Sequence, residues 1–294
     1  MSLMFRTHDG LALQGRAWPC RYARGTIVIV HGLGEHIGRY AHVAASLNAG
    51  GWSVVGYDQR GHGASEGRRG RLGATDDLLR DLAVVVDAVR GAADFSAPLA
   101  PLAPLVLLGH SMGGTVASRF VAGGLETPTP AWWRPVDALV LSSPALDLGM
   151  GPLQTAMLAT LEPLAPNLGI GNGLKPAWIS RDPAVVAAYI ADPLVHDRIA
   201  PRLVRFLFDA GVAVRALAPG WIVPTLLLYA GNDRCVVPAG SAAFAAAAPK
   251  GVVTVRVFEG LFHEIFNEPE QAEVLSVLGS WLDTLPVSPS RSPR

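Results

Sequence analysis

The stretch PLVLLGHSMGGTVASRFVAG (104–123) joins a run of strand-forming residues directly to a run with helical spacing. Its centre, GHSMG (109–113), matches G-x-S-x-G, which indicates a nucleophilic serine when a strand precedes it and a helix follows it. The glycines permit a sharp turn that lifts the Ser111 hydroxyl above the sheet at a helix N-terminus, where negative charge is favoured. The alternative is a small residue in an ordinary tight turn. The flanking strand and helix favour the nucleophile.

Similar apolar runs of strand length recur along the chain. After two short alternating segments at 2–7 and 11–18, they are TIVIVHG (26–32), GWSVVGYD (51–58), PLVLLGHS (104–111), VDALVLSSP (136–144), PTLLLYAGND (224–233) and GVVTVRVFEG (251–260). Continuous Val, Ile and Leu without alternation are typical of parallel strands covered on both faces. Helical spacing over 75–90 and 268–285 adds the intervening helices. We therefore predict an α/β protein with a mostly parallel, doubly wound sheet.

The segment 145–220 interrupts this pattern, because it contains no good strand and consists of short helix-like pieces separated by Pro and Gly. Between two late strands it is too long for a loop, so we predict a helical cap over the carboxyl edge of the sheet, where ligands bind in open α/β folds. A helical excursion without ligand contact is the alternative. The predicted core is then residues 1–144 and 221–285. The Pro/Ser/Arg-rich tail 286–294 is expected to be disordered.

Charge balance and cysteine usage exclude several classes of function. The 294 residues contain 24 Lys and Arg against 24 Asp and Glu, so there is no overall basic field for nucleic acid or for an anionic membrane. Cys20 and Cys235 form neither a disulfide framework nor a metal-binding spacing, which favours a reducing, cytoplasmic location. No signal peptide and no membrane-spanning stretch are predicted, since the apolar runs are short and broken by proline.

A nucleophilic serine needs a base, and the base needs an orienting group. In strand–serine–helix sites of this type the partners follow in the order serine, acid, histidine. Asp233 ends the predicted strand 224–233, and His263, the only histidine C-terminal to it, follows the next predicted strand. We therefore predict a catalytic triad of Ser111, Asp233 and His263. The weaker candidates for the acid are Glu259, Glu264 and Asp209.

Acyl transfer also needs two N–H donors aimed at the oxyanion. We assign them to Met112, the residue after the nucleophile, and to Leu33 in HGLGEH (31–36), whose glycines let the backbone bend toward Ser111. These glycines miss the dinucleotide pattern G-x-G-x-x-G by one residue. No ligand spacing for a metal is present, and HEIFN (263–267) lacks the second histidine of a zincin. Neither a cofactor nor a metal is therefore predicted.

Five motifs resemble the monoacylglycerol lipase and lysophospholipase branch of the α/β-hydrolases. They are HGLGEHIGRY (31–40), YDQRGHGASEG (57–67), GHSMGG (109–114), GNDRCVVP (231–238) and FHEIFNE (262–268). The resemblance runs from about residue 25 to 285 and is thin in the cap, where only Asp192-Pro193-Leu194 matches. For YDQRGHG (57–63) we expect structural ion pairing and turn formation, not direct catalysis.

The resemblance implies an α/β-hydrolase fold with a helical cap over an apolar channel, and no cofactor. It implies the same triad, Ser111, Asp233 and His263, and an oxyanion hole from the Leu33 and Met112 N–H groups. The thiol sensitivity associated with a cap cysteine in the mammalian monoacylglycerol lipase does not carry over, because the predicted cap has no matching cysteine. Cys235, beside the predicted acid, is the only thiol near the predicted site. We expect the channel to be roofed by residues such as Leu153, Met157, Leu161, Trp178 and Ile179.

The expected function is that of a serine hydrolase that cleaves carboxylic esters of single-chain lipids, first of all monoacylglycerol, through an acyl-enzyme on Ser111. Its expected partner is a small-molecule lipid ester, with at most transient contact between the cap and a membrane surface. Lysophospholipids and simpler esters are alternative substrates. An aminopeptidase or amidase would need an acidic cluster in the cap, and Glu162, Asp182 and Asp192 are too scattered to form one. A non-catalytic binder on the same fold is the third alternative, against which the intact triad argues.

Overall fold

The computed structural model describes residues 1–91 and 104–286, and eight strands in this part of the chain form one sheet. They are β1 (Ser2–Arg6), β2 (Ala12–Trp18), β3 (Gly25–Val30), β4 (Trp52–Tyr57), β5 (Leu105–His110), β6 (Ala138–Ser142), β9 (Thr225–Ala230) and β10 (Val253–Phe258). Their spatial order is β1-β2-β4-β3-β5-β6-β9-β10, with β1 and β2 antiparallel to their neighbours and all other pairs parallel. The predicted mostly parallel sheet is therefore confirmed.

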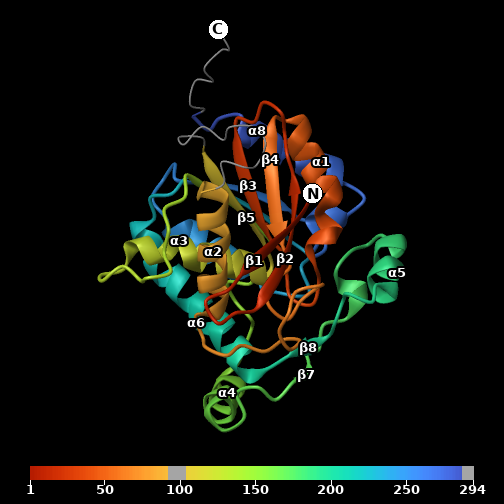
Figure 1. The fold of residues 1–294 in the computed structure, drawn as a ribbon. Helices are drawn as coiled ribbons and strands as arrows, with labels where there is room; N and C mark the ends of the chain where they lie inside the picture. The colour runs from red at the N-terminus through yellow and green to blue at the C-terminus, as the bar shows by residue number, and fades with distance from the viewer. Residues whose placement is uncertain (92–103, 287–294) are drawn as a thin grey trace.

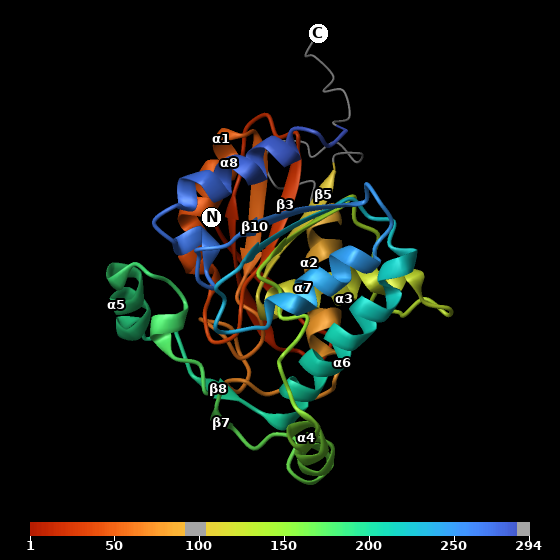
Figure 2. The ribbon, with the colours of Figure 1, turned by 180° about the vertical axis from the view of Figure 1, so that it is seen from behind.

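Helices cover both faces of the sheet (Figures 1 and 2). One face carries α1 (Ala41–Ala49) and α8 (Gln271–Leu282), and the other carries α2 (Asp77–Gly91), α3 (Met112–Ala122), α6 (Pro201–Leu217) and α7 (Pro238–Ala247). In β3, Ile27 and Ile29 pack into the α1 and α8 layer, whereas Val28 and Val30 pack into the opposite layer. Because both faces are buried, the apolar runs show no alternation.

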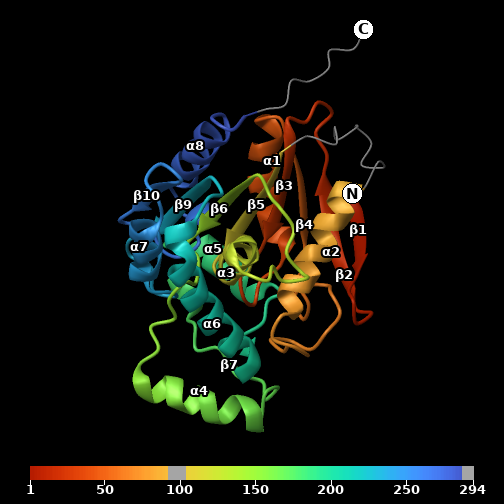
Figure 3. The ribbon, with the colours of Figure 1, turned by 90° about the vertical axis from the view of Figure 1, so that its left-hand side faces the viewer.

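Residues 145–220 lie between β6 and β9 (Figure 3). The segment contains α4 (Pro152–Leu164), η3 (Pro176–Trp178), α5 (Pro183–Ala191) and α6, with β7 (Ile170–Gly171) and β8 (Arg198–Ile199) paired antiparallel. The expectation of no strand in this segment is wrong for this ladder, because two residues per strand are too few to leave a pattern. Figures 1 and 2 show α4 and α5 standing away from the sheet.

The helix α6 anchors the insertion to the core. Its Phe206, Ala210 and Val214 are buried in the same apolar cluster as α3, and a Cβ on Gly211 would lie only 2.5 Å from the Leu146 carbonyl oxygen. The division into core and cap at residues 145 and 220 is our proposal, and α6 is the part of the proposed cap that packs as a core helix.

Two further predictions from the sequence concern the C-terminal tail and membrane-spanning helices. The tail 286–294, for which we expect disorder, lies outside the described residues apart from Pro286. Within residues 1–91 and 104–286, none of the helices combines the length and the apolar character needed to cross a bilayer.

Candidate active site

Ser111 occupies a strained turn between β5 and α3. Its φ is 52° and its ψ is −120°, a conformation that L side chains rarely adopt. A Cβ on Gly109 would lie 2.4 Å from the Gly113 oxygen, and one on Gly113 would lie 2.0 Å from the Val30 oxygen. Only glycine therefore allows α3 to start this close to β5 and β3.

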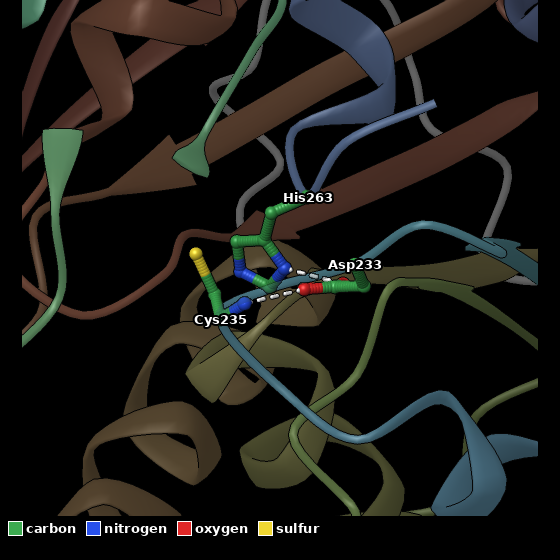
Figure 4. Close-up of side chains that lie close together, drawn as sticks. All are labelled: Asp233, Cys235 and His263. Carbon is green, nitrogen blue, oxygen red and sulfur yellow. Dashed lines mark hydrogen bonds and ion pairs between the residues drawn. The ribbon is translucent and has the colours of Figure 1, made fainter. Parts of the chain in front are cut away.

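Ser111, His263 and Asp233 form one hydrogen-bonded chain at the carboxyl edge of the sheet. The Ser111 Oγ–H donates to His263 Nε2 over 2.8 Å, and His263 Nδ1–H donates to Asp233 Oδ2 over 2.7 Å (Figure 4 shows the second bond). The other oxygen of Asp233 accepts the backbone N–H groups of Cys235 and Val236 at 2.8 and 3.1 Å. The carboxylate is thus held on both sides.

Three parallel strands bring these side chains together, since Ser111 follows β5, Asp233 follows β9 and His263 follows β10. Of the alternative acids, Glu264 pairs with Arg39 and Asp209 pairs with Arg205. No hydrogen bond or ion pair links any of the three alternative acids to His263 in the described part of the chain.

The electrostatics of the pair suit a base that takes up a proton. Burial would lower the pKa of His263, but the charge of Asp233 and its hydrogen bond outweigh burial and raise this pKa above the ordinary value. Burial would likewise raise the pKa of Asp233, and the charge of His263, its hydrogen bond and the two backbone N–H groups lower it instead. An imidazolium formed beside Asp233 is therefore stabilised.

Glu35 holds the loop 31–36 against the serine. The Gly32 N–H donates to Glu35 Oε1 over 2.6 Å, and a Cβ on Gly32 would lie 3.2 Å from the Ser111 Cβ. The N–H groups of Leu33 and Met112 donate to no group within residues 1–91 and 104–286. They are available to a ligand, as the oxyanion-hole assignment requires.

The Glu35 carboxylate is buried and fully bonded. It accepts Tyr40 Oη–H at 2.7 Å and Arg39 Nη1–H at 2.8 Å, besides Gly32. Burial would raise the pKa of Glu35, but the positive charge of Arg39, with smaller contributions from nearby histidines, lowers it to about 2. Glu35 is therefore an anion that positions the loop.

Arg39 connects this loop to the loop that carries His263. Its guanidinium donates to both oxygens of Glu264 at 2.7 and 2.6 Å, and Glu264 is the residue after His263. On its other side the guanidinium lies 4.9 Å from the ring centroid of Tyr189 in α5. The proposed cap, the histidine loop and the oxyanion loop meet at this one side chain.

Two further contacts join the proposed cap to the loop 31–36. His36 Nε2 and Asp192 Oδ2 lie 2.8 Å apart, and the His196 N–H donates to the Gly34 oxygen over 2.9 Å. Gly34 has a φ of +79°, and a Cβ there would lie 2.3 Å from the His196 oxygen, so this approach requires glycine.

A cavity of about 430 Å³ opens above Ser111. Its apolar lining consists of Leu33, Leu174, Pro176, Ile179, Tyr189, Ile190 and Val195. Of the five residues expected to roof a channel, only Ile179 lines it. Leu153 and Met157 are instead 75% and 59% exposed, because α4 projects away from the sheet.

Within residues 1–91 and 104–286, two groups of side chains bring three donor atoms within 4.8 Å of one another, and neither suits a metal ion. They are Asp233, Cys235 and His263, and His8, Asp9 and Asp77. In the first, burial and the Asp233 charge raise the pKa of the Cys235 thiol well above its ordinary value, so it is not a thiolate. In the second, Arg60 pairs with Asp77 and Asp9 at 2.7 and 3.0 Å. The absence of a cofactor stays a prediction.

A family model described as serine aminopeptidase, S33, or Hydrolase_4, matches residues 21–270. The chain belongs to the Hydrolase_4 family. A monoacylglycerol lipase of Mycolicibacterium smegmatis is 38% identical to this Hydrolase_4 member over 262 residues, which cover 88% of each chain. Phospholipase YtpA of Bacillus subtilis is 29% identical over 269 residues, covering 90% of this chain and 98% of that protein.

A solved structure has a fold similar to that of this chain. The crystal structure of Paleococcus ferrophilus monoacylglycerol lipase matches this Hydrolase_4 member with a TM-score of 0.78 at 31% identity, covering 93% of this chain and 99% of that one. The α/β-hydrolase fold and the monoacylglycerol lipase branch, both predicted from motifs, are therefore confirmed.

Sequence reasoning placed the three central side chains and missed their supports. The sequence alone assigns no role to Glu35, Arg39 or Tyr40, which all lie in HGLGEHIGRY (31–40). Their position beside the nucleophile could have suggested a role, because charged residues four apart can pair on one turn. The loop 57–63 is structural as expected: Arg60 binds both oxygens of Asp81 at 2.6 and 2.7 Å.

Proposed function

We propose that this Hydrolase_4 member is a carboxylic ester hydrolase that cleaves monoacylglycerols through an acyl-enzyme on Ser111. The observation that carries the proposal is the hydrogen-bonded chain from Ser111 through His263 to Asp233, in a cavity that also has seven apolar lining residues. The names of the relatives support the substrate class, since two of them are monoacylglycerol lipases.

The reaction follows from the geometry. Ser111 Oγ attacks the ester carbonyl while its proton passes to His263 Nε2, 2.8 Å away. Asp233 keeps the other ring nitrogen protonated and stabilises the imidazolium. The negative charge on the carbonyl oxygen meets the Leu33 and Met112 N–H groups. His263 then protonates the departing glycerol oxygen, and a water molecule activated by His263 releases the fatty acid and frees Ser111.

The cavity lining supports a single acyl chain. Leu33, Ile179 and Val195 line the same cavity as Ser111, and each methylene of the substrate that is buried against such side chains contributes about 0.8 kcal/mol. A cavity of about 430 Å³ accepts one chain more easily than three. A glycerol monoester is therefore the preferred substrate over a triacylglycerol.

An aminopeptidase, the activity in the family's description, would need a free carboxylate for the substrate ammonium. Four carboxylates line the cavity, and each has a cationic or histidine partner: Glu35 and Glu264 pair with Arg39, Asp192 with His36 and Asp197 with Arg198. The ester is therefore favoured. Lysophospholipid hydrolysis is the second candidate, which the Bacillus subtilis phospholipase supports.

We also propose transient contact between the cap and a membrane surface, and a cytoplasmic location. Leu153, Met157 and Leu164 on α4 are exposed apolar side chains that support the membrane contact. Cys20 and Cys235 are both free, which supports a reducing compartment.

Competition assays with matched oleoyl chains test the substrate. Monoolein, triolein, lysophosphatidylcholine and an aminoacyl p-nitroanilide are offered to the native chain, with Ser111→Ala as the blank. Monoolein should give the highest kcat/KM. Faster turnover of triolein contradicts the single-chain cavity, faster turnover of lysophosphatidylcholine makes the protein a phospholipase, and cleavage of the anilide alone makes it an aminopeptidase.

A further inference from the structure

A second cavity, of about 550 Å³, lies between the loop after β4 and the β7–β8 ladder. Its lining consists of Gly67, Arg68, Arg69, Arg71, Gly169 and Arg198, and we call it the arginine groove. The loop approaches the ladder closely, because a Cβ on Gly70 would lie 2.3 Å from the Arg198 oxygen. Four guanidinium groups therefore border one surface hollow.

The charges of this groove are largely uncompensated. Arg68, Arg69 and Arg71 form no ion pair with any carboxylate in residues 1–91 and 104–286. Arg69 instead donates to the backbone oxygens of Gly61 and Gly63, at 3.3 and 2.9 Å, which fixes the loop. Arg198 pairs with the exposed Asp197 at 3.1 Å. The zero net charge of the chain thus conceals a local cationic site.

Exposed apolar side chains flank the arginine groove. Leu168 and Ile170 stand on either side of its Gly169 and are 52% and 46% exposed, and Leu164 at the end of α4 is 78% exposed. Figures 1, 2 and 3 agree that α4, the ladder and the loop after β4 lie at the same end of the molecule. Arginines beside exposed aliphatic side chains are the composition of a surface that rests on lipid headgroups.

We propose that the arginine groove binds the phosphate groups of an anionic bilayer while Leu164, Leu168 and Ile170 enter its outer apolar layer. The role of this contact in catalysis rests on the proposed function. A long-chain monoacylglycerol partitions into membranes, so docking would bring the cap and the cavity above Ser111 to the bilayer that contains the substrate. The loop after β4 belongs to the core, so the docking surface includes more than the cap.

The test compares the loss of two arginines from the groove with the loss of two cations from another part of the surface. Arg68→Gln/Arg71→Gln removes two arginines whose side chains form no hydrogen bond or ion pair within residues 1–91 and 104–286, and leaves Arg69 to hold the loop. The matched control, Arg21→Gln/Lys250→Gln, removes two exposed cations that precede β3 and β10, at the opposite edge of the sheet from the loop after β4. Both variants change the net charge equally.

Vesicle flotation of the full chain measures the binding. Vesicles of phosphatidylcholine alone are compared with vesicles that contain about 30% phosphatidylglycerol, at ionic strengths from about 0.05 to about 0.5 M. The native chain and the control should bind the anionic vesicles, with loss of binding at high salt. Arg68→Gln/Arg71→Gln should bind about 25-fold more weakly, from about fivefold per arginine.

Three results overturn the proposal: equal binding to both kinds of vesicle, equal loss in the control, or no loss in the groove variant. Saturable binding of inorganic phosphate to the groove without any preference for anionic vesicles also overturns it, in favour of a soluble anion. Hydrolysis of p-nitrophenyl butyrate in solution, measured on the same samples, should be unchanged. If that ester is not cleaved while vesicle binding persists, the proposed function fails and the docking surface stands.

Discussion

The carboxylate of Glu35 binds the backbone N–H of Gly32 at 2.6 Å and so fixes the peptide that leads to the Leu33 N–H. Tyr40 and Arg39 bind the same carboxylate at 2.7 and 2.8 Å, which prevents it from turning away. One buried anion thus sets the orientation of a backbone donor that we assign to the oxyanion hole.

Replacing Glu35 with leucine should therefore lower kcat by about 100-fold with little change in KM, the loss expected for one oxyanion donor. Glu35→Gln keeps an oxygen for the Gly32 N–H and should lose less than about tenfold. Steady-state kinetics with p-nitrophenyl butyrate and thermal unfolding of both variants provide the measurement. Equal losses in the two variants, or a loss that lies in KM, would show that Glu35 does not act through this N–H.

Ser111→Ala should reduce ester kcat by on the order of 10³-fold or more and leave the fold intact, because the oxyanion hole and the cavity remain. The rate with p-nitrophenyl butyrate and the circular dichroism spectrum of the variant check both statements. If the variant keeps a tenth of the native activity, Ser111 is not the nucleophile.

The sequence predicted the sheet and the three central residues because these are local or ordered signals. An apolar run of strand length is a property of a few neighbouring residues, and Ser111, Asp233 and His263 each follow such a run. Parallel strands place their carboxyl ends at one edge, so the order of the motifs was enough to bring them together.

The interior of the site was harder to predict, since it depends on contacts between distant segments. Arg39 binds Glu264, 225 positions later in the chain, and its guanidinium lies over the ring of Tyr189 in the proposed cap. The position of α4 also depends on its packing against α6, which its own composition does not reveal. This is why Leu153 and Met157, apolar residues expected in the channel, lie on the surface instead.

Activity should fall on the acid side with a midpoint above the ordinary histidine value of 6.5. The protonated imidazole cannot accept the Ser111 proton, and Asp233 raises the pKa of His263, so the inactive form persists to higher pH. The pH dependence of kcat/KM for a non-ionising p-nitrophenyl ester measures this midpoint. A profile that stays flat well below 6.5 would contradict His263 as the base.

Ser111→Gly should unfold at a higher denaturant concentration than Ser111→Ala. At a φ of 52° a Cβ is strained, and glycine relieves the strain, which is worth about 1 kcal/mol. Equilibrium unfolding in urea compares two inactive variants that differ only in that Cβ. Equal stability of the two would mean that the turn at Ser111 stores no backbone strain.

Ile179 should contribute to the preference for long acyl chains, because it lines the cavity over Ser111 and is 5% exposed. Ile179→Ala removes apolar contact from a bound chain, so kcat/KM for a decanoyl ester should fall by about tenfold, against less than about threefold for a butyryl ester that is too short to use the contact. The backbone oxygen of Ile179, which accepts the Glu264 N–H at 2.8 Å, is unaffected by the change.

Leu153→Ala is the matched control: it removes an aliphatic side chain from the same insertion, but one that is exposed on α4 and does not line the cavity. With p-nitrophenyl esters kept below their micellar concentration, the control should leave the ratio of the two esters unchanged. If Ile179→Ala lowers kcat/KM equally for both esters, this side chain supports the histidine loop and does not contact the acyl chain. If Leu153→Ala changes the ratio of kcat/KM for the two esters as much as Ile179→Ala does, the acyl chain lies along α4 instead of in the cavity.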